Sequence, residues 1–525
     1  MKLSDVLLGA ILCISTPVIG TWTPVTGKLT PVTRKWSVGQ KVHTQSGPVL
    51  GSAASKAAEV SVYLGIPYAE PPIGDLRFAA SQPYFGNASI DGTKFGASCP
   101  VSDFFYGKPD TKGKNLSAAG LATVAHLSRN KNDSSEDCLT LNVWTKPQTG
   151  EKKKAVVIWV HGKGYTSGAS SDPVYDGQLI ADEEDIVLVT FNYRINIFGF
   201  PGNVNGTMNI GLLDQRLAIE WVRDNIDAFG GDPARMSLFG DSAGAGLVDL
   251  YSFAYVDNPI ISGIALLSGS ATLRGRNPDD KKIAECDWIQ MTCELGCSSI
   301  EDNDPAEVLA CMRNKTTAEI TAAIPIDINP YGTKAFFPNV DDKHVFPDYY
   351  KRTVAGKYIQ VPMLIGSTED ETSYHHTMAN AFSVPQYNLN WAYESNSTYT
   401  CPASNRARAA AERGLPTWRY AYFGDFKSSR LTTAAHGRAY HGSDVLLVFG
   451  TALVPGVKPD ADEIRLAKYA RGAFGAFARD PKAGLKKYGW PLYDNDTKSL
   501  VQLGLKNKVG AFAVNRKMYD RFCPY

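Results

Sequence analysis

Five short and almost continuously apolar segments recur along this chain, and they constrain its fold more than any other feature. They are "AVVIWVHG" at 155–162, "DIVLVTFNY" at 185–193, "MSLFG" at 236–240, "GIALLSGS" at 263–270 and "VPMLIGS" at 361–367. A strand that is solvated on one face alternates apolar and polar residues, whereas a strand covered on both faces loses that alternation. We therefore predict a large, mostly parallel sheet covered by helices on both faces.

The segment between the second and third of these strands has helical spacing. It reads "IGLLDQRLAIEWVRDNIDAFG" and spans 210–230, and the apolar residues expected on its buried face are Leu213, Leu217, Trp221 and Val222. A strand, a helix and a further strand in this order imply a right-handed crossover in an α/β sheet. No internal repeat or composition break divides the chain, so we expect one domain.

The stretch "LFGDSAGAG" at 238–246 places Ser242 between two glycines, where the third strand passes into the start of a helix. In a chain with 47 glycines this pattern can arise by chance, and the serine could be an ordinary turn residue. However, a serine on a strand-to-helix turn presents its hydroxyl at a helix N-terminus, which favours developing negative charge. The context therefore favours Ser242 as a nucleophile.

The N-terminal sequence "MKLSDVLLGAILCISTPVIG" has an early lysine, a short apolar stretch and then small residues. This pattern predicts a secretory signal at 1–20 and an exported mature chain at 21–525; a buried N-terminal helix is the alternative. The apolar stretch is short for a membrane span, so we expect no integral membrane association. Seven N-x-[ST] sequons could be glycosylated in a eukaryotic secretory route, at Asn87, Asn115, Asn132, Asn205, Asn314, Asn396 and Asn495.

Charge and cysteine content narrow the function further. Lysine plus arginine number 54 and aspartate plus glutamate 53, a balance that argues against nucleic acid as the main partner. The lysine run 152–154 precedes a strand, and we expect it to be a solvated edge. Beyond Cys13 in the expected signal, eight cysteines suggest disulfides. Zinc is the competing interpretation, but neither a CxxC pattern nor a His–Cys spacing supports it, so no metal is expected.

Several ordered blocks resemble the type-B carboxylesterase/lipase family, the cholinesterase-like branch of the α/β-hydrolases. Within that family, the chain resembles the secreted fungal members. The blocks are "YLGIPYAEPPIGDLRF" at 63–78, "SEDCLTLNVW" at 135–144, "WVRDNIDAFGGDPARMSLFGDSAGA" at 221–245, "IGSTEDETSYH" at 365–375 and "HGSDVLLVFG" at 441–450. The resemblance runs from about residue 40 to "GWPLYDND" at 489–496. It implies an α/β-hydrolase fold.

The resemblance also implies a catalytic triad of Ser242 as nucleophile, Glu371 as acid and His441 as base. Glu369 and Asp370 are rivals for the acid, and the family's D-E pair places it second. His436 is a rival for the base, but only His441 is followed by glycine and the apolar run. Adjacent histidines rarely share a metal, so we interpret His375 and His376 as surface or packing residues.

The same resemblance implies an oxyanion hole in the loop "VHGKGYTSG" at 160–168. Gly164 and Ala243 are the expected backbone N–H donors. Lys163 stands where the family has a glycine, and it can still donate if its backbone adopts the required conformation with a Cβ present. Thr372 likewise replaces the glycine that usually follows the acid, so the local backbone there could differ.

By resemblance, Cys99 pairs with Cys138 and Cys297 with Cys311. For the other four cysteines we prefer the pairs 286–293 and 401–523. The loop closed at 99–138 contains "FFYG" at 104–107 and an apolar segment with Leu121, Val124 and Leu127. It could be a lid for lipid substrates or a structured rim packed on the body. It lacks the tryptophan that holds choline in cholinesterases, which argues against a choline ester as substrate.

The sequence thus predicts a secreted serine hydrolase that cleaves small-molecule or lipid carboxylic esters without a metal or organic cofactor. The alternative is a non-catalytic adhesion or binding protein of the same fold, since such members of the family have lost the chemistry. All three triad positions are filled here, which favours catalysis. Acyl-chain length, alcohol preference and oligomeric state are left open by the sequence.

Overall fold

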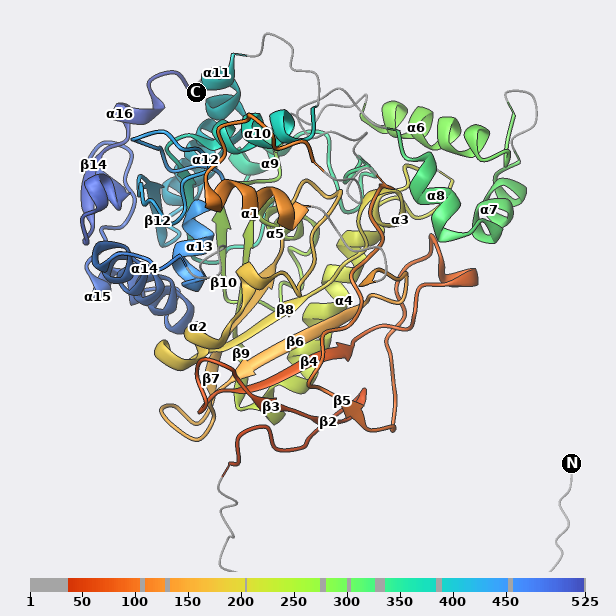
Figure 1. The fold of residues 1–525 in the computed structure, drawn as a ribbon, viewed down its shortest axis with the longest axis horizontal. Coiled ribbons are helices and arrows are strands. Elements are labelled where there is room, and N and C mark those ends of the chain that lie inside the picture. Colours follow the sequence, from red (N-terminus) through yellow and green to blue (C-terminus); the bar gives the residue numbers. More distant parts are fainter. Residues whose placement is uncertain are drawn as a thin grey trace, which may run out of the picture. The chain divides into compact units, whose positions relative to one another are not determined.

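The computed structural model (Figure 1) describes residues 36–103, 109–127, 133–203, 205–273, 280–299, 304–325, 336–383, 390–451 and 457–523. The predicted signal at 1–20 and the "FFYG" segment at 104–107 lie outside the described residues. None of the helices in the described ranges is both long enough and apolar enough to span a membrane.

An 11-stranded sheet forms the centre of the fold, in the order β14-β13-β12-β11-β10-β9-β7-β8-β6-β4-β3. Its consecutive strands from β13 to β8 pair in parallel, and the flanking pairs are antiparallel. The strands are β3 (Ser52–Ala53), β4 (Ser61–Pro67), β6 (Thr140–Thr145), β7 (Lys154–Val160), β8 (Val187–Phe191), β9 (Gly231–Asp241), β10 (Gly263–Leu267), β11 (Met363–Thr368), β12 (Thr417–Tyr422), β13 (Lys498–Leu503) and β14 (Phe512–Asn515). All five apolar segments are strands of this sheet, as predicted.

The sheet is buried on both faces, which explains why the strand sequences show no alternation. Strand β7 sends Val156 and Ile158 into a core shared with α4 (Ile210–Asn225) and α5 (Ala243–Ala254). The intervening Val157 and Trp159 enter the opposite core, shared with α13 (Ser443–Phe449) and α14 (Ala461–Arg479). The α/β-hydrolase arrangement expected from the sequence is therefore confirmed, and Figure 1 shows helices on either side of the sheet.

Helix α4 fills the predicted crossover, but its buried face is rotated from the expected one. Trp221 and Val222 are buried as expected, whereas Leu213 and Leu217 are only half-buried. The helix is buried instead along the set Leu212, Asp214, Gln215, Ala218 and Ile219. Asp214 is buried because Arg194 forms a two-pronged ion pair with it, which apolar periodicity alone cannot foresee.

The lysine run also differs from expectation at one position. Lys152 and Lys153 are exposed, but the Lys154 side chain is fully buried at the start of β7. Its ammonium pairs with the carboxylate of Asp185 and donates to the carbonyl of Thr149. A buried lysine is tolerated when such partners replace water, so only the first two lysines form a solvated edge.

The remaining elements surround the sheet. They are β1 (Val42–Thr44), β2 (Gly47–Leu50), β5 (Ile90–Asp91), α1 (Ala118–Leu127), α2 (Gln178–Glu183), α3 (Asn196–Gly199), α6 (Asp280–Glu294), α7 (Pro305–Asn314), α8 (Thr317–Ala323), α9 (Tyr349–Val354), α10 (Glu371–Ala381), α11 (Trp391–Ser395), α12 (Cys401–Glu412), α15 (Gly484–Tyr488) and α16 (Lys517–Asp520), with short turns between them. Strands β1, β2 and β5 form a separate small sheet.

Three disulfides join Cys99 to Cys138, Cys297 to Cys311 and Cys401 to Cys523. The preferred pair 286–293 is wrong, because both cysteines are free. They lie two helical turns apart on α6, at a rise of about 1.5 Å per residue, beyond the reach of one disulfide.

The loop closed by the first disulfide packs partly on the body. On α1, Val124 is buried against Met378 and Ala381 of α10, whereas Leu121 is 44% exposed; nothing is described of the Leu127 side chain. Of the seven sequon asparagines, Asn87, Asn115, Asn205 and Asn314 are exposed, Asn396 and Asn495 are half-buried, and Asn132 lies outside the described ranges.

Candidate active site

Ser242 occupies a tight turn between the end of β9 and the start of α5. Its backbone lies at φ 56° and ψ −122°, a region that L-residues rarely adopt. Such strain persists only where the surroundings hold it, and it concentrates at functional sites. The turn places Ser242 at the N-terminus of the 12-residue helix α5, the position that a nucleophilic serine takes in a strand-turn-helix motif.

Glycines around this turn allow the backbone segments to approach closely. A Cβ on Gly240 would meet the backbone of Gly244 at 2.6 Å, and one on Gly244 would meet the Val160 carbonyl oxygen at 2.1 Å. A Cβ on Gly162 would lie 2.9 Å from the Cβ of Ser242. The loop after β7 therefore packs directly against the serine turn, and side chains at these three positions would open it.

Glu371 and His441 meet although 70 residues separate them in sequence. The Nδ1 atom of His441 lies 2.6 Å from Oε2 of Glu371, and both side chains are buried. The other oxygen, Oε1, accepts hydrogen bonds from the Ser268 hydroxyl at 2.7 Å and the Thr368 N–H at 2.6 Å. The carboxylate is thus fixed by three groups, which come from the residue after β10, the end of β11 and the histidine loop.

The rival residues lie elsewhere. Glu369 and Asp370 are paired with Arg438 at 3.3 and 3.5 Å, on the more exposed side of the same turn. His436 is exposed. Thr372, which replaces the family's glycine, lies inside α10 and donates to the Trp391 carbonyl at 3.1 Å, so helical backbone at this position needs no glycine.

The free edge of the His441 ring faces away from Glu371. Its Nε2 is buried and has no hydrogen-bond partner within the described ranges. A Cβ on Gly442 would lie 3.9 Å from Oδ2 of Asp241, so the residue after the histidine contacts the residue before Ser242. Burial lowers the pKa of His441, but the hydrogen bond and charge of Glu371 outweigh burial and raise the pKa above its usual value.

Two buried carboxylates beside this histidine were missed by the sequence reasoning. Burial raises the pKa of Asp241 to about 7, with His441 opposing the shift. Burial also raises the pKa of Asp444 to about 6, although Tyr420 donates a hydrogen bond to it at 2.6 Å. Their closeness to the predicted triad in sequence, in "GDSAG" and "HGSD", was the available signal.

His375 is not a surface residue. It is buried, with its ring centroid 5.1 Å from that of His441, and its Nε2 forms a 2.8 Å hydrogen bond with the Tyr399 hydroxyl. The Tyr399 ring lies 4.9 Å from His441 and the Tyr374 ring 6.0 Å from it. The rings of Tyr374, His375 and Tyr399 thus pack around the imidazole. His376 instead packs edge-on against Trp391.

The loop after β7 contains three consecutive residues in the left-handed region, Lys163, Gly164 and Tyr165, with φ of 74°, 68° and 64°. The ammonium of Lys163 pairs with the buried carboxylate of Asp172. The loop thus accommodates Lys163 with its Cβ in a conformation that glycine favours. The backbone N–H groups of Gly164 and Ala243 donate to no acceptor in the part of the chain that the structure describes.

The order and direction of the strands in the 11-stranded sheet are those of an α/β-hydrolase. The sequence model of the carboxylesterase family matches residues 39–395 and 391–523, and the chain belongs to this family. A PNB esterase structure superposes with a TM-score of 0.71 at 24% identity, covering 91% of this chain and 97% of that one, which supports the fold.

Similar proteins include a chlorogenic acid esterase of Aspergillus niger, 29% identical over 90% of this chain and 91% of that protein. A secreted lipase of Gibberella zeae is 30% identical over 91% of this chain and 93% of that protein. An acetylcholinesterase of Bungarus fasciatus is 29% identical over 88% of this chain and 82% of that protein. The chain is accordingly a carboxylic ester hydrolase, and its substrate is an ester.

Proposed function

We propose that this chain cleaves carboxylic esters through an acyl-enzyme on Ser242, with His441 as base and Glu371 as its orienting acid. The observation that carries the proposal is the 2.6 Å contact between Glu371 and Nδ1 of His441. The buried Nε2 has no hydrogen-bond partner among the described residues, Ser242 included, and is therefore available to accept a proton. A neutral imidazole held in this tautomer accepts a proton at Nε2.

In the first half of the reaction, the Oγ of Ser242 attacks the ester carbonyl carbon while Nε2 of His441 takes the hydroxyl proton. Glu371 stabilises the imidazolium and stays ionised. The tetrahedral intermediate then collapses, the bond to the alcohol oxygen breaks, and His441 gives its proton to that oxygen. Water repeats the same steps on the acyl-enzyme, releasing the carboxylic acid and restoring Ser242.

The negative charge that develops on the carbonyl oxygen needs donors held in advance. The N–H groups of Gly164 and Ala243 are the proposed donors, since both lie on backbone packed around the serine turn and have no acceptor among the described residues. Lys163 is a proposed third donor. Loss of one such donor typically costs about 3–4 kcal/mol of transition-state stabilisation.

The finer substrate class is proposed from the relatives. Two similar proteins, a chlorogenic acid esterase and a secreted lipase, give two substrate classes to compare. The decisive experiment measures hydrolysis of p-nitrophenyl esters across acyl lengths, of chlorogenic acid, and of a triglyceride emulsion. Preference for short soluble esters supports an esterase, whereas a rate that rises sharply above the emulsion threshold supports a lipase.

The nucleophile is tested separately. Wild-type protein is treated with diethyl p-nitrophenyl phosphate and digested, and the modified peptide is identified by mass spectrometry. We expect one diethylphosphoryl group on Ser242 and loss of activity, and we expect Ser242→Ala to be inert and unlabelled. An active alanine variant, or a label on another serine, would reject the proposed nucleophile. Wild-type protein that cleaves no ester would instead favour the non-catalytic binding protein.

We further propose that residues 1–20 are a signal and that 21–525 is the secreted mature domain. The three disulfides and the secreted lipase among the relatives support export. N-terminal sequencing of protein recovered from the medium of a eukaryotic host tests this proposal. A mature chain that begins near residue 21 is the expected result, and retention of the intact N-terminus inside the cell would contradict it.

A further inference from the structure

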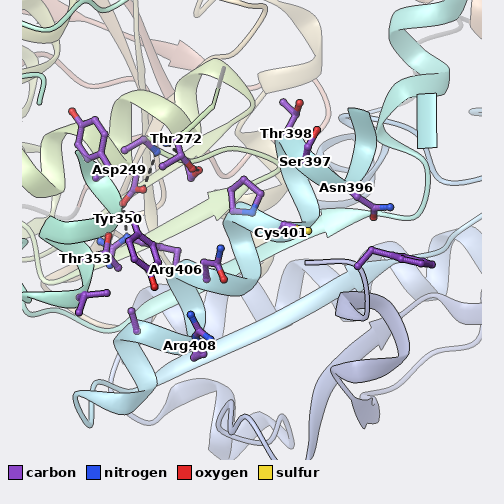
Figure 2. A pocket seen from close by; sticks show the side chains of 18 of the residues that line it. Asp249, Thr272, Tyr350, Thr353, Asn396, Ser397, Thr398, Cys401, Arg406 and Arg408 are labelled. Atoms are coloured by element: carbon purple, nitrogen blue, oxygen red, sulfur yellow. Dashed lines mark hydrogen bonds and ion pairs between the residues drawn. The ribbon is translucent and has the colours of Figure 1, made fainter. Parts of the chain in front are cut away.

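A cavity of about 1180 Å³ lies among helices α5, α9, α11 and α12, and Figure 2 shows it from close by. Ser242, Glu371 and His441 are absent from its lining. In the view, Asp249, Thr353 and Arg406 gather on one side and residues 396–398 on the other. The size is that of a pocket for a small organic molecule. Neither the sequence motifs nor the proposed reaction uses it.

The lining contains a buried ion pair whose hydrogen-bonding capacity is not filled. The Arg406 side chain is only 4% exposed, and its Nε donates to Oδ1 of Asp249 at 2.9 Å. Its Nη2 donates to the Ser252 hydroxyl at 3.1 Å. Asp249 also accepts from that hydroxyl at 3.1 Å and from the Ala271 N–H at 2.9 Å. The carboxylate is therefore well compensated.

One nitrogen of this guanidinium is left over. Nη1 of Arg406 is buried and meets no acceptor at full hydrogen-bond geometry within the described ranges. The guanidinium is nevertheless near enough to the Tyr358 hydroxyl to oppose the rise in the pKa of Tyr358 that burial causes. The guanidinium carbon lies 3.9 Å from the ring centre of Tyr358 and 4.9 Å from that of Phe253, so aromatic rings cover the planar group. A buried donor without an acceptor is costly, which makes it a strong partner for any acceptor that reaches it.

The mouth of the same cavity is rich in exposed large side chains. Tyr350, Val354, Tyr393 and Phe522 all line it and are 54%, 58%, 64% and 66% exposed. Single exposed apolar residues are ordinary, but a group of them around one cavity marks a place where apolar surface is covered by a ligand. The aromatic rings among these side chains can pack against a planar aromatic group or an aliphatic chain of a ligand.

We propose that this cavity is a second ligand site for a monocarboxylate with an aromatic or aliphatic body. One carboxylate oxygen accepts from Nη1 of Arg406, and the body lies against the side chains at the mouth. A hydrogen bond to a buried guanidinium is charge-assisted and therefore stronger than one between neutral groups. Hydrolysis of a carboxylic ester releases such an acid, so the protein's own activity supplies ligands of this class.

The charge of the lining predicts how this binding responds to salt. Arg406, Arg408 and Arg413 are opposed by Asp249, Glu394 and Glu412, so the lining has no net formal charge. Long-range attraction of the anion is therefore weak, and its affinity depends on the contact at Arg406. Because buried contacts are screened much less than exposed charges, binding should change little when salt rises from about 50 mM to about 500 mM.

The test is isothermal titration of the full-length mature protein with naphthalene-2-carboxylate and with naphthalene-2-carboxamide, a neutral control of the same shape. Four variants accompany the wild type. Arg406→Lys keeps a cation for Asp249 but removes Nη1, Asn405→Trp fills the cavity, Ser242→Ala alters only the candidate active site, and Asn396→Gln removes a sequon at the cavity wall. Thermal unfolding checks that each variant is folded.

We expect the wild type and Ser242→Ala to bind the acid equally at one site, and the amide to bind roughly tenfold more weakly. Arg406→Lys and Asn405→Trp should each weaken acid binding by about tenfold or more. Equal affinity for acid and amide would overturn the anionic specificity. Unchanged affinity in Asn405→Trp, which leaves Arg406 in place, would overturn the site even if Arg406→Lys is unstable.

Two further results would also contradict the proposal. Loss of binding in Ser242→Ala would place the acid in the candidate active site. If glycosylated wild type bound no acid while Asn396→Gln bound it, the cavity would be occupied by the protein's own glycan in its secreted form. Equal binding by Asn396→Gln and wild type is the result expected for an independent ligand site.

Discussion

Glu371 contacts Nδ1 of His441 at 2.6 Å through one carboxylate oxygen, while its other oxygen accepts from Ser268 and from the Thr368 backbone. The three groups come from the residue after β10, the end of β11 and the loop before α13, so the carboxylate is held from several sides. This arrangement orients the imidazole before any substrate arrives, and pre-oriented groups cost no reorganisation during the reaction.

Replacing Glu371 by Gln should lower kcat by about 10²–10⁴-fold, since the neutral amide no longer fixes the tautomer or stabilises the imidazolium. His441 must be neutral to accept a proton, so activity rises with pH through its pKa. The Glu371 charge raises that pKa, and the acidic limb of the kcat/KM profile should therefore move to lower pH in the variant.

The matched controls are Glu369→Gln and Asp370→Asn, whose side chains pair with Arg438 instead. Both should keep kcat within about threefold of wild type. A loss in either control as large as that in Glu371→Gln would reassign the acid.

Asp241 should make stability depend on pH. Its pKa is raised to about 7 by burial from a usual value near 3.8, so the folded state binds more protons than the unfolded state between these values. Stability therefore falls as pH rises from about 4 to about 7, by at most about 4 kcal/mol from this group. Asp241→Asn cannot ionise there, and its free energy of unfolding should change less over the same range.

Urea unfolding of wild type and Asp241→Asn at several pH values measures this difference. The variant should gain stability relative to wild type with increasing pH and show its largest advantage above pH 7. If the difference in unfolding free energy between the two proteins stayed constant across the range, either Asp241 would be ionised throughout or its pKa would be raised equally in the unfolded state.

The sheet was predictable because burial on both faces leaves a direct mark on strand composition, as in 155–162 and 263–270. Its pairing order is a long-range property that strand composition does not specify. The α/β-hydrolase fold and the assignment of Glu371 and His441 to one site came from family resemblance. Nothing in the spacing of two residues 70 positions apart specifies that their loops end at one sheet edge.

The failures have a common physical origin in polar pairs that apolar periodicity does not register. Lys154 is buried because Asp185 meets it, and Asp214 is buried on α4 because Arg194 meets it. His375 is the packing residue that one of the two predicted alternatives gives, but its partner Tyr399, whose ring also lies against His441, could not be foreseen from the sequence. Each partner is distant in sequence, so only the folded chain shows the pair.

Lys163 should matter more for stability than for catalysis. Lys163→Gly keeps the backbone N–H and suits the left-handed conformation at φ 74°, which saves about 1 kcal/mol of strain. It also removes the cation paired with buried Asp172, a loss that typically costs about 3–5 kcal/mol when the pair is fully buried. The expected result is a lower midpoint of thermal unfolding with kcat within about threefold of wild type.

Addition of Asp172→Asn separates the two effects, because the neutral amide no longer needs the ammonium. The double variant should recover much of the lost stability in thermal unfolding. A fall in kcat of about 100-fold in Lys163→Gly alone, with the fold intact, would mean that the lysine side chain itself acts in the reaction.

The cysteine pairing predicts a definite thiol count. Cys286 is exposed and Cys293 half-buried on α6, and the other six cysteines of residues 36–523 are in disulfides. Protein that lacks residues 1–20 should therefore release one equivalent of thionitrobenzoate rapidly from Ellman's reagent when folded, and two when unfolded without reductant. Cys286→Ser should abolish the rapid phase and leave one thiol after unfolding. No reactive thiol in the unfolded, unreduced chain would instead show a fourth disulfide and contradict the placement of both residues on one continuous helix.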